Sequence, residues 1–216
     1  MPRGFVVAIL GAECTGKSTL AVQLAQALGD EGSSTIVVDE YLREFCDAHG
    51  RTPLPHEQAS IAAEQTRRID AAAATHALVI ADTTALLTAV YSEYVFNDCA
   101  PYAQAGRDHG RVDLTLLTAL DLPWQPDGLQ RDGPQVRAPV DALIRSALQR
   151  AGLAYCVVSG AGSARMEAAL RAVRHALAAR GDGDGEGAGT APRWHWNCER
   201  CGDSGCERHL LPTVLN

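Results

Sequence analysis

The chain has 216 residues, of which 46% are hydrophobic and 21% charged, a composition typical of a globular protein and unlike that of a disordered or fibrous one. Its 26 acidic residues against 19 basic ones give a net charge of -7, which argues against a protein that wraps nucleic acid. No apolar run approaches the roughly 20 residues that span a bilayer, so we expect a cytoplasmic protein without a membrane partner.

Short apolar segments alternate with segments of helical periodicity over residues 1–180. In chain order, strands are expected at residues 5–10, 35–38, 77–81, 112–119 and 154–158. Helices are expected between and after these strands. Apolar residues at helical spacing, or residues that end a helix, place them within residues 17–29, 41–50, 56–74, 86–97, 136–147 and 166–177. This alternation predicts an α/β fold in which helices cover both faces of a parallel sheet.

Two segments interrupt this pattern. Proline and glycine punctuate residues 122–134, which predicts a loop or lid. Glycine and acidic residues make up residues 181–189, GDGDGEGAG, a composition typical of a flexible linker. We therefore divide the chain into an α/β domain at 1–180, a linker at 181–193 and a cysteine-containing tail at 194–216.

The clearest functional motif lies between the first expected strand and helix. Residues 11–18, GAECTGKS, fit the phosphate-loop pattern G-x-x-x-x-G-K-[ST], which predicts a P-loop NTPase fold that binds ATP and Mg²⁺. Lys17 is the only lysine beside 18 arginines, as expected for a compact ammonium at the β- and γ-phosphates. The nucleotide-binding residues predicted here are Gly11, Glu13, Thr15, Gly16, Lys17, Ser18 and Thr19, with Ser18 also on Mg²⁺.

Acidic residues end two of the expected strands, at the sheet edge where open α/β folds bind ligands. Asp82 follows residues 77–81 and is predicted to hold Mg²⁺; the alternative is that it caps the next helix. Asp39 and Glu40 follow residues 35–38. Either acid is a candidate to accept a proton from an attacking hydroxyl or to hold a sugar, and a role in starting the helix is the alternative.

Three arginines are candidates for contacts with phosphate or substrate. Arg131 and Arg137 flank the irregular segment 122–134, and a guanidinium there would stabilise charge on a transferred phosphoryl group. The alternative is that both are exposed solubilising residues. Arg43 follows Asp39 by four residues, a spacing that suits either an ion pair on a helix or a substrate contact.

Four segments in order carry a family resemblance: GAECTGKST at 11–19, EYLREF at 40–45, ADTT at 81–84 and PWQPDGL at 123–129. Together they resemble the ribosylnicotinamide kinase domain of bacterial NadR-type proteins, among the AAA-like P-loop ATPases and kinases, over about residues 4–160. The resemblance implies an enzyme of NAD biosynthesis that uses MgATP to phosphorylate the ribose 5′-hydroxyl of nicotinamide riboside.

The resemblance also implies roles for particular residues. It implies ATP and Mg²⁺ binding at Gly11, Gly16, Lys17, Ser18 and Asp82. It implies riboside contacts at Glu40, Tyr41 and Arg43, and lid contacts at Asp127 and Arg131.

The chain departs from the family where Asp-Thr-Asp usually stands, because residues 82–84 read Asp-Thr-Thr. Thr84 therefore replaces a carboxylate near the expected metal. The phosphate loop begins about ten residues into the chain, so we expect a stand-alone kinase module. The alternative function is a regulatory ATP-binding protein that signals through its C-terminal tail.

That tail contains a spacing typical of a metal site. Three thiols and one imidazole in the order C-x2-C-x4-C-x2-H predict structural, tetrahedral Zn²⁺ on Cys198, Cys201, Cys206 and His209. His195 is an alternative fourth ligand, and a disordered tail with reactive thiols is the alternative to a metal site. Such a tail is a candidate contact for a protein partner or a second copy of the chain.

Overall fold

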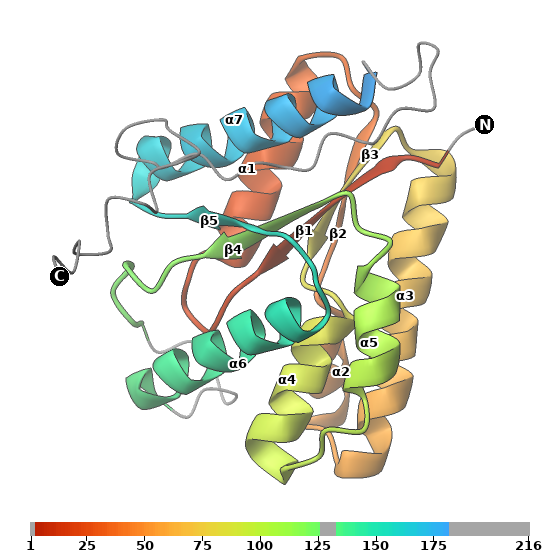
Figure 1. Ribbon diagram of the computed structural model, residues 1–216, viewed down its shortest axis with the longest axis vertical. Helices are drawn as coiled ribbons and strands as arrows, with labels where there is room; N and C mark the ends of the chain where they lie inside the picture. The colour runs from red at the N-terminus through yellow and green to blue at the C-terminus, as the bar shows by residue number, and fades with distance from the viewer. Residues whose placement is uncertain (1–2, 126–132, 182–216) are drawn as a thin grey trace, which may run out of the picture. The chain divides into compact units, whose positions relative to one another are not determined.

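A five-stranded parallel sheet forms the centre of the computed structural model, which describes residues 3–125 and 133–181 (Figure 1). The strand order is β2-β3-β1-β4-β5. The strands are β1 (Phe5–Leu10), β2 (Thr35–Val38), β3 (Leu78–Asp82), β4 (Leu114–Thr118) and β5 (Cys156–Val158). All five expected strands are confirmed, and the observed strands begin one or two residues later at β3, β4 and β5.

Helices cover both faces of this sheet (Figure 1). One face packs against α1 (Lys17–Asp30) and α7 (Gly162–Gly181). The other face packs against α3 (Gln58–Thr75), α4 (Ala85–Phe96), α5 (Tyr102–His109) and α6 (Arg137–Arg150). The remaining helix, α2 (Tyr41–His49), packs against α3, and short 3-10 turns lie at Pro55–Glu57 and Pro134–Val136.

Helix α5 was not among the expected elements. Its sequence, YAQAGRDH, is mostly polar, and its buried side chains are Ala105 and His109. Two buried positions give no apolar periodicity in eight residues, so the local sequence pattern carries little helical signal.

Strand β1 is buried along its whole length, as its continuous apolar sequence predicts. Phe5, Val7 and Ile9 pack toward α1 and α7, whereas Val6 and Leu10 belong to the clusters on the opposite face. Because successive side chains of a strand point to opposite faces, one six-residue strand contributes to the core on both sides of the sheet.

The pairing of β1 with β3 and β4 positions the candidate site. Ile9 pairs with Asp82 of β3, and Leu10 pairs with Leu117 of β4. The carboxyl ends of these three strands therefore meet at one edge of the sheet, and the phosphate loop leaves β1 at that edge.

Several predicted residues lie outside the described part of the chain. These are the lid residues Asp127 and Arg131 and the zinc ligands Cys198, Cys201, Cys206 and His209, with the alternative ligand His195. Among the described residues, no helix is both long and apolar enough to cross a membrane.

Candidate nucleotide-binding site

The phosphate loop fits tightly against strand β4. A Cβ atom on Gly11 would lie 1.9 Å from Thr118 Oγ1, so only glycine fits at this position. Gly16 has φ +77 and is the N-cap of α1, a left-handed conformation that glycine adopts without steric cost. Cys14 has a positive φ of 54, although it is not glycine. The loop therefore holds a shape that a typical sequence would avoid.

Hydrogen bonds inside the loop maintain this shape. Buried Thr15 donates its hydroxyl to Ala12 O at 2.8 Å, and Thr118 Oγ1 lies 2.7 Å from Thr15 Oγ1. The Lys17 ammonium donates to Ala12 O at 3.0 Å. Ser18 is exposed, as is Thr19, on the first turn of α1. The Thr15 side chain thus stabilises the loop itself, and Lys17 and Ser18 are the side chains closer to solvent.

Arg165, on α7, ties the phosphate loop to the loops after β4 and β5. Its side chain is only 6% exposed and donates to Thr15 O at 2.8 Å, to Gly160 O at 2.9 Å and to the Asp121 carboxylate at 2.8 Å. Burial raises the pKa of Asp121, but the Gly160 N–H and the guanidinium outweigh burial and lower it overall. In a planar trans peptide, N–H and C=O point in opposite directions, so the Gly16 N–H points away from Arg165.

Asp82 ends β3, and Glu40, two residues after β2, lies near both Asp82 and Lys17. Asp82 is 3% exposed, and its Oδ1 has no hydrogen-bond partner among the described residues. The Glu40 side chain is 15% exposed and pairs with Arg43 at 3.6 Å. Burial raises the pKa of Glu40 above its ordinary value, the Lys17 ammonium opposes that shift, and the Asp82 carboxylate adds to it. Asp39, by contrast, is exposed.

The helix-capping alternative for Asp82 does not hold, because Thr84 is the N-cap of α4. Its hydroxyl accepts from Leu86 N at 3.3 Å. The same hydroxyl lies 2.8 Å from His109 Nδ1, and His109 Nε2 lies 2.8 Å from Thr115 Oγ1. Burial lowers the pKa of His109 from 6.5 to about 4, so the imidazole is neutral at physiological pH. Thr84 thus belongs to a buried, uncharged hydrogen-bond network.

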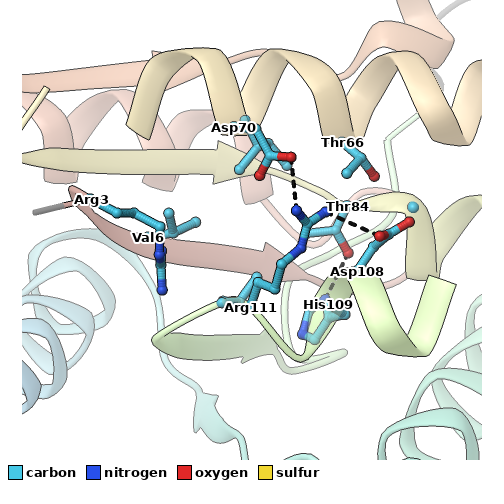
Figure 2. A pocket seen from close by; sticks show the side chains of 11 residues that line it. Arg3, Val6, Thr66, Asp70, Thr84, Asp108, His109 and Arg111 are labelled. Carbon is cyan, nitrogen blue, oxygen red and sulfur yellow. Dashed lines mark hydrogen bonds and ion pairs between the residues drawn. The ribbon is translucent and has the colours of Figure 1, made fainter. Parts of the chain in front are cut away.

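A hollow beside that network lies away from the phosphate loop (Figure 2). It is bordered by the start of β1, by α3, and by the turn between α5 and β4. Arg111 bridges Asp70 and Asp108 across it, each at 3.0 Å, as the dashed lines in Figure 2 show. Because Arg111 already pairs with both carboxylates, we interpret the hollow as a structural contact and not as the ligand site.

The predicted substrate residues Tyr41 and Arg43 begin α2 beside Glu40. The guanidinium of Arg68 lies 4.4 Å from the centre of the Tyr41 ring, and Arg68 is itself bound by Glu44 and Glu64. One face of the Tyr41 ring is therefore covered from α3. Arg43 pairs with Glu40 three residues earlier.

Arg137 is not an exposed solubilising residue, so that alternative is wrong for this position. It is 8% exposed and donates to Leu122 O at 2.9 Å. Its Nε and one terminal nitrogen are buried without a hydrogen-bond partner among the described residues. Leu122 in turn approaches the phosphate loop, because a Cβ on Gly16 would meet its side chain at 3.0 Å.

The residues at this edge fit a magnesium ion. Mg²⁺ takes oxygen ligands, commonly one or two carboxylates with phosphate and water, and Asp82 presents a buried carboxylate oxygen that lacks a partner among the described residues. Ser18 supplies a hydroxyl on the first turn of α1. Within the described residues, no group of three or more His, Cys, Asp or Glu side chains forms a protein-only metal site.

A central strand that enters a helix through an anion-binding loop, beside a strand that ends in a buried acid, defines the P-loop class of nucleotide-binding α/β domains. Residues 6–165 match the family model described as AAA domain, and the chain belongs to this family.

The chain is similar to the trifunctional NAD biosynthesis/regulator proteins NadR of Salmonella typhimurium and Escherichia coli. It is 31% identical to each over 135 residues, which is 60% of this chain and 32% of theirs. The chain therefore spans about a third of the length of these relatives.

Two solved structures of NadR share its fold. A complex with NAD and AMP-PNP matches with a TM-score of 0.63 and 21% identity, over 81% of this chain and 50% of the other. A complex with NR matches with a TM-score of 0.64 and 21% identity, over 80% and 50%.

Sequence reasoning missed Arg165, Thr118 and Gln65, which all contact the loops of the site. They lie outside the phosphate-loop motif and the acidic strand ends. Arg165 is 150 residues from the Thr15 carbonyl that it contacts, and no local pattern signals such a contact.

Proposed function

We propose that this chain is an ATP-dependent kinase that phosphorylates a small nucleoside-like hydroxyl, with the ribose 5′-hydroxyl of nicotinamide riboside as the first candidate. The observation that carries this proposal is the grouping of Lys17, Asp82 and Glu40 at one edge of the sheet. A simple nucleotide-binding switch needs the loop and a metal-binding acid, but it does not need a second buried carboxylate. Relatives named for NAD biosynthesis, and a solved NadR structure in complex with NR, support the substrate.

In this proposal the phosphate loop binds the phosphates of ATP through its backbone N–H groups and the Lys17 ammonium. Ser18 and Asp82 would hold Mg²⁺, which supplies charge neutralisation between the β- and γ-phosphates when bound. Lys17 would exchange its hydrogen bond to Ala12 O for phosphate oxygens. Arg137 Nε and one of its terminal nitrogens, which lack a hydrogen-bond partner among the described residues, are the donors that we assign to the nucleotide.

Glu40 is the residue that we assign to the acceptor hydroxyl. It lies near Lys17 and Asp82, whereas Asp39 is exposed. A buried carboxyl with a raised pKa accepts a proton more readily than an ordinary glutamate, and phosphoryl transfer needs the hydroxyl oriented in line with the γ-phosphate. Tyr41 and Arg43, which follow on α2, are the proposed contacts to the rest of the riboside.

The test is a coupled assay of ADP formation on the full chain, with nicotinamide riboside and a panel of other nucleosides. The single lysine makes Lys17→Ala the blank, because no other ammonium side chain in the sequence replaces it. We expect ADP formation that depends on riboside, and formation of nicotinamide mononucleotide in equal amount. Both signals should be lost in the blank.

Two results would contradict the proposal in different ways. ADP formation with another nucleoside and not with the riboside would keep the kinase and change the acceptor. Slow hydrolysis that no acceptor accelerates would instead favour a regulatory ATP-binding protein, and the metal site predicted in the tail would then be the candidate signalling element.

A further inference from the structure

Gln65 is a buried amide that joins the two loops carrying the site carboxylates. It lies on α3 and is 2% exposed. Its Oε1 accepts the Tyr41 N–H at 2.8 Å, and its Nε2 donates to Asp39 O at 3.3 Å and to Thr83 O at 3.5 Å. The oxygen thus faces a donor and the nitrogen faces two acceptors, so this network allows only one orientation of the amide.

These contacts lie where the sheet no longer connects the two loops. The ladder between β2 and β3 ends at the pair Val38 and Ala81, one residue before Asp82 and two before Glu40. Beyond that pair, Gln65 contacts the backbone on both sides of Glu40 and directly after Asp82. Main-chain hydrogen bonds connect β2 with β3 as far as this pair. Beyond it, the Gln65 side chain connects the two loops.

The residue after Asp82 needs such support. Thr83 is buried and has φ +80, a left-handed conformation that a β-branched residue rarely adopts. Its N–H donates to Ile9 O at 3.1 Å, and its carbonyl accepts from Gln65. A strained residue keeps such a conformation only when its surroundings hold it there, and this residue directly follows Asp82 in the chain.

We propose that Gln65 is a positioning residue that holds the Asp82 carboxylate at the Mg²⁺ position of the nucleotide site and keeps Glu40 beside it. The inference rests on the proposed binding of MgATP, but not on the identity of the acceptor. Gln65 acts through Asp82, so its removal weakens the metal-dependent part of nucleotide binding and leaves the phosphate loop unchanged.

The test is calorimetric titration of AMP-PNP into the full chain, with and without Mg²⁺, for Gln65→Met, Asp82→Asn and the double variant. Methionine is close to glutamine in size and lacks its hydrogen bonds. We expect Gln65→Met to reduce the tightening of binding by Mg²⁺ about tenfold, as loss of an outer-shell partner does. Without Mg²⁺ its affinity should match that of the unmodified chain. The double variant should bind no more weakly than Asp82→Asn, because coupled residues are not additive.

Gln58→Met is the matched control. Gln58 lies two turns earlier on the same helix and is also buried, with 5% exposed. Its Oε1 lacks a hydrogen-bond partner among the described residues. It should keep the full Mg²⁺ effect. Gln65→Glu is the second variant if methionine prevents folding, because it keeps the shape and the acceptor for Tyr41 N–H while losing the amide donors. It should show the same selective loss.

Three results would overturn the inference. The first is an unchanged Mg²⁺ effect in folded Gln65→Met or Gln65→Glu. The second is an equal loss of affinity with and without Mg²⁺, which indicates a general structural role. The third is that Mg²⁺ does not tighten AMP-PNP binding in the unmodified chain, or that Asp82→Asn does not reduce this tightening. A chain that shows the expected pattern but phosphorylates no nucleoside would contradict the kinase proposal alone.

Discussion

Glu40 combines burial with two neighbouring charges, and its titration gives a prediction at the scale of one residue. A proton acceptor must be ionised, so the turnover rate should fall as pH falls through the raised pKa of Glu40. The acid limb of the kcat profile should therefore lie above the ordinary glutamate pKa of about 4.3. Glu40→Gln should lower kcat by about 100-fold and remove this limb.

Nucleoside-dependent ADP formation measured across pH checks this prediction, with calorimetry to show that Glu40→Gln still binds AMP-PNP. Glu44→Gln is the control, because Glu44 lies one turn further along α2 with 60% of its side chain exposed and pairs with Arg68. An unchanged acid limb in Glu40→Gln would assign the proton transfer to another group, with Asp39 the next candidate.

His109 gives a second residue-scale prediction, for stability instead of turnover. Its pKa is about 4 in the folded chain and 6.5 when unfolded, so the unfolded chain binds more protons between these values. The free energy of unfolding should therefore fall as pH drops through this window, and this histidine should account for about 2 kcal/mol of the loss between pH 7 and pH 5.

Urea unfolding of the unmodified chain and of His109→Asn at the two pH values measures this difference directly. The asparagine variant should lose about 2 kcal/mol less on acidification. His175→Asn, an exposed histidine on α7, should behave like the unmodified chain. Equal losses in all three proteins would show that His109 does not control acid stability.

Strained residues explain why single positions matter so much in the site. Gly11 has no room for a Cβ atom, and Thr83 lies in a left-handed conformation despite its branched side chain. Thr84 stands where the family resemblance predicts an acid. In this chain its hydroxyl caps α4 and contacts neutral His109, so the position serves the buried network rather than a metal.

At the scale of elements, α7 supports the phosphate loop through Arg165, whose guanidinium holds the Thr15 carbonyl. Arg165→Ala would remove the donor to that carbonyl and the ion pair of Asp121, which would keep its hydrogen bond from the Gly160 N–H. We expect the dissociation constant for AMP-PNP to rise about tenfold, equivalent to about 1.4 kcal/mol, both with and without Mg²⁺. This pattern differs from the selective loss expected at Gln65, because the phosphate loop itself is affected.

Calorimetric titration with and without Mg²⁺ distinguishes the two patterns. Arg174→Ala is the matched control on the same helix, since Arg174 is 54% exposed and pairs with Glu31 at the surface. Exposed ion pairs contribute little to stability, so this variant should bind AMP-PNP normally. If Arg165→Ala binds as tightly as the unmodified chain, the loop keeps its shape without this arginine.

At the scale of the whole molecule, we predict a zinc site in the tail, which lies outside the described residues. We expect the purified, reduced full chain to hold one zinc ion, because three thiolates and one imidazole complete a closed tetrahedral site. Cys198→Ser combined with Cys201→Ser should remove the metal and leave AMP-PNP binding unchanged, as expected of a structural site. Elemental analysis of the dialysed protein measures the metal content.

Cys99→Ser is the control for that experiment, since Cys99 is an exposed free thiol in the described part of the chain. It should keep its zinc. A chain that holds no zinc, or a double variant that keeps it, would show that the cysteine spacing does not form the predicted site.

Much of the fold could be predicted because its signals are local. Short, mostly apolar segments marked all five strands, and turn residues such as Gly50 and Asn97 marked helix ends, where both adopt the left-handed conformation. Helix α5 was missed because its few buried residues lack a periodic pattern. The phosphate loop was also recognisable from a local signal, because its function requires glycine, lysine and serine at a fixed short spacing.

The sequence by itself determined the phosphate loop, the five strands and the acids that follow two of them, because each depends on neighbours a few residues away. Only the tertiary structure decided the strand order, which puts Asp82 beside the loop and Glu40 one strand further. It also decided the supporting contacts of Gln65 and Arg165. These contacts include pairs 18 and 150 positions apart, which form only once the chain has packed.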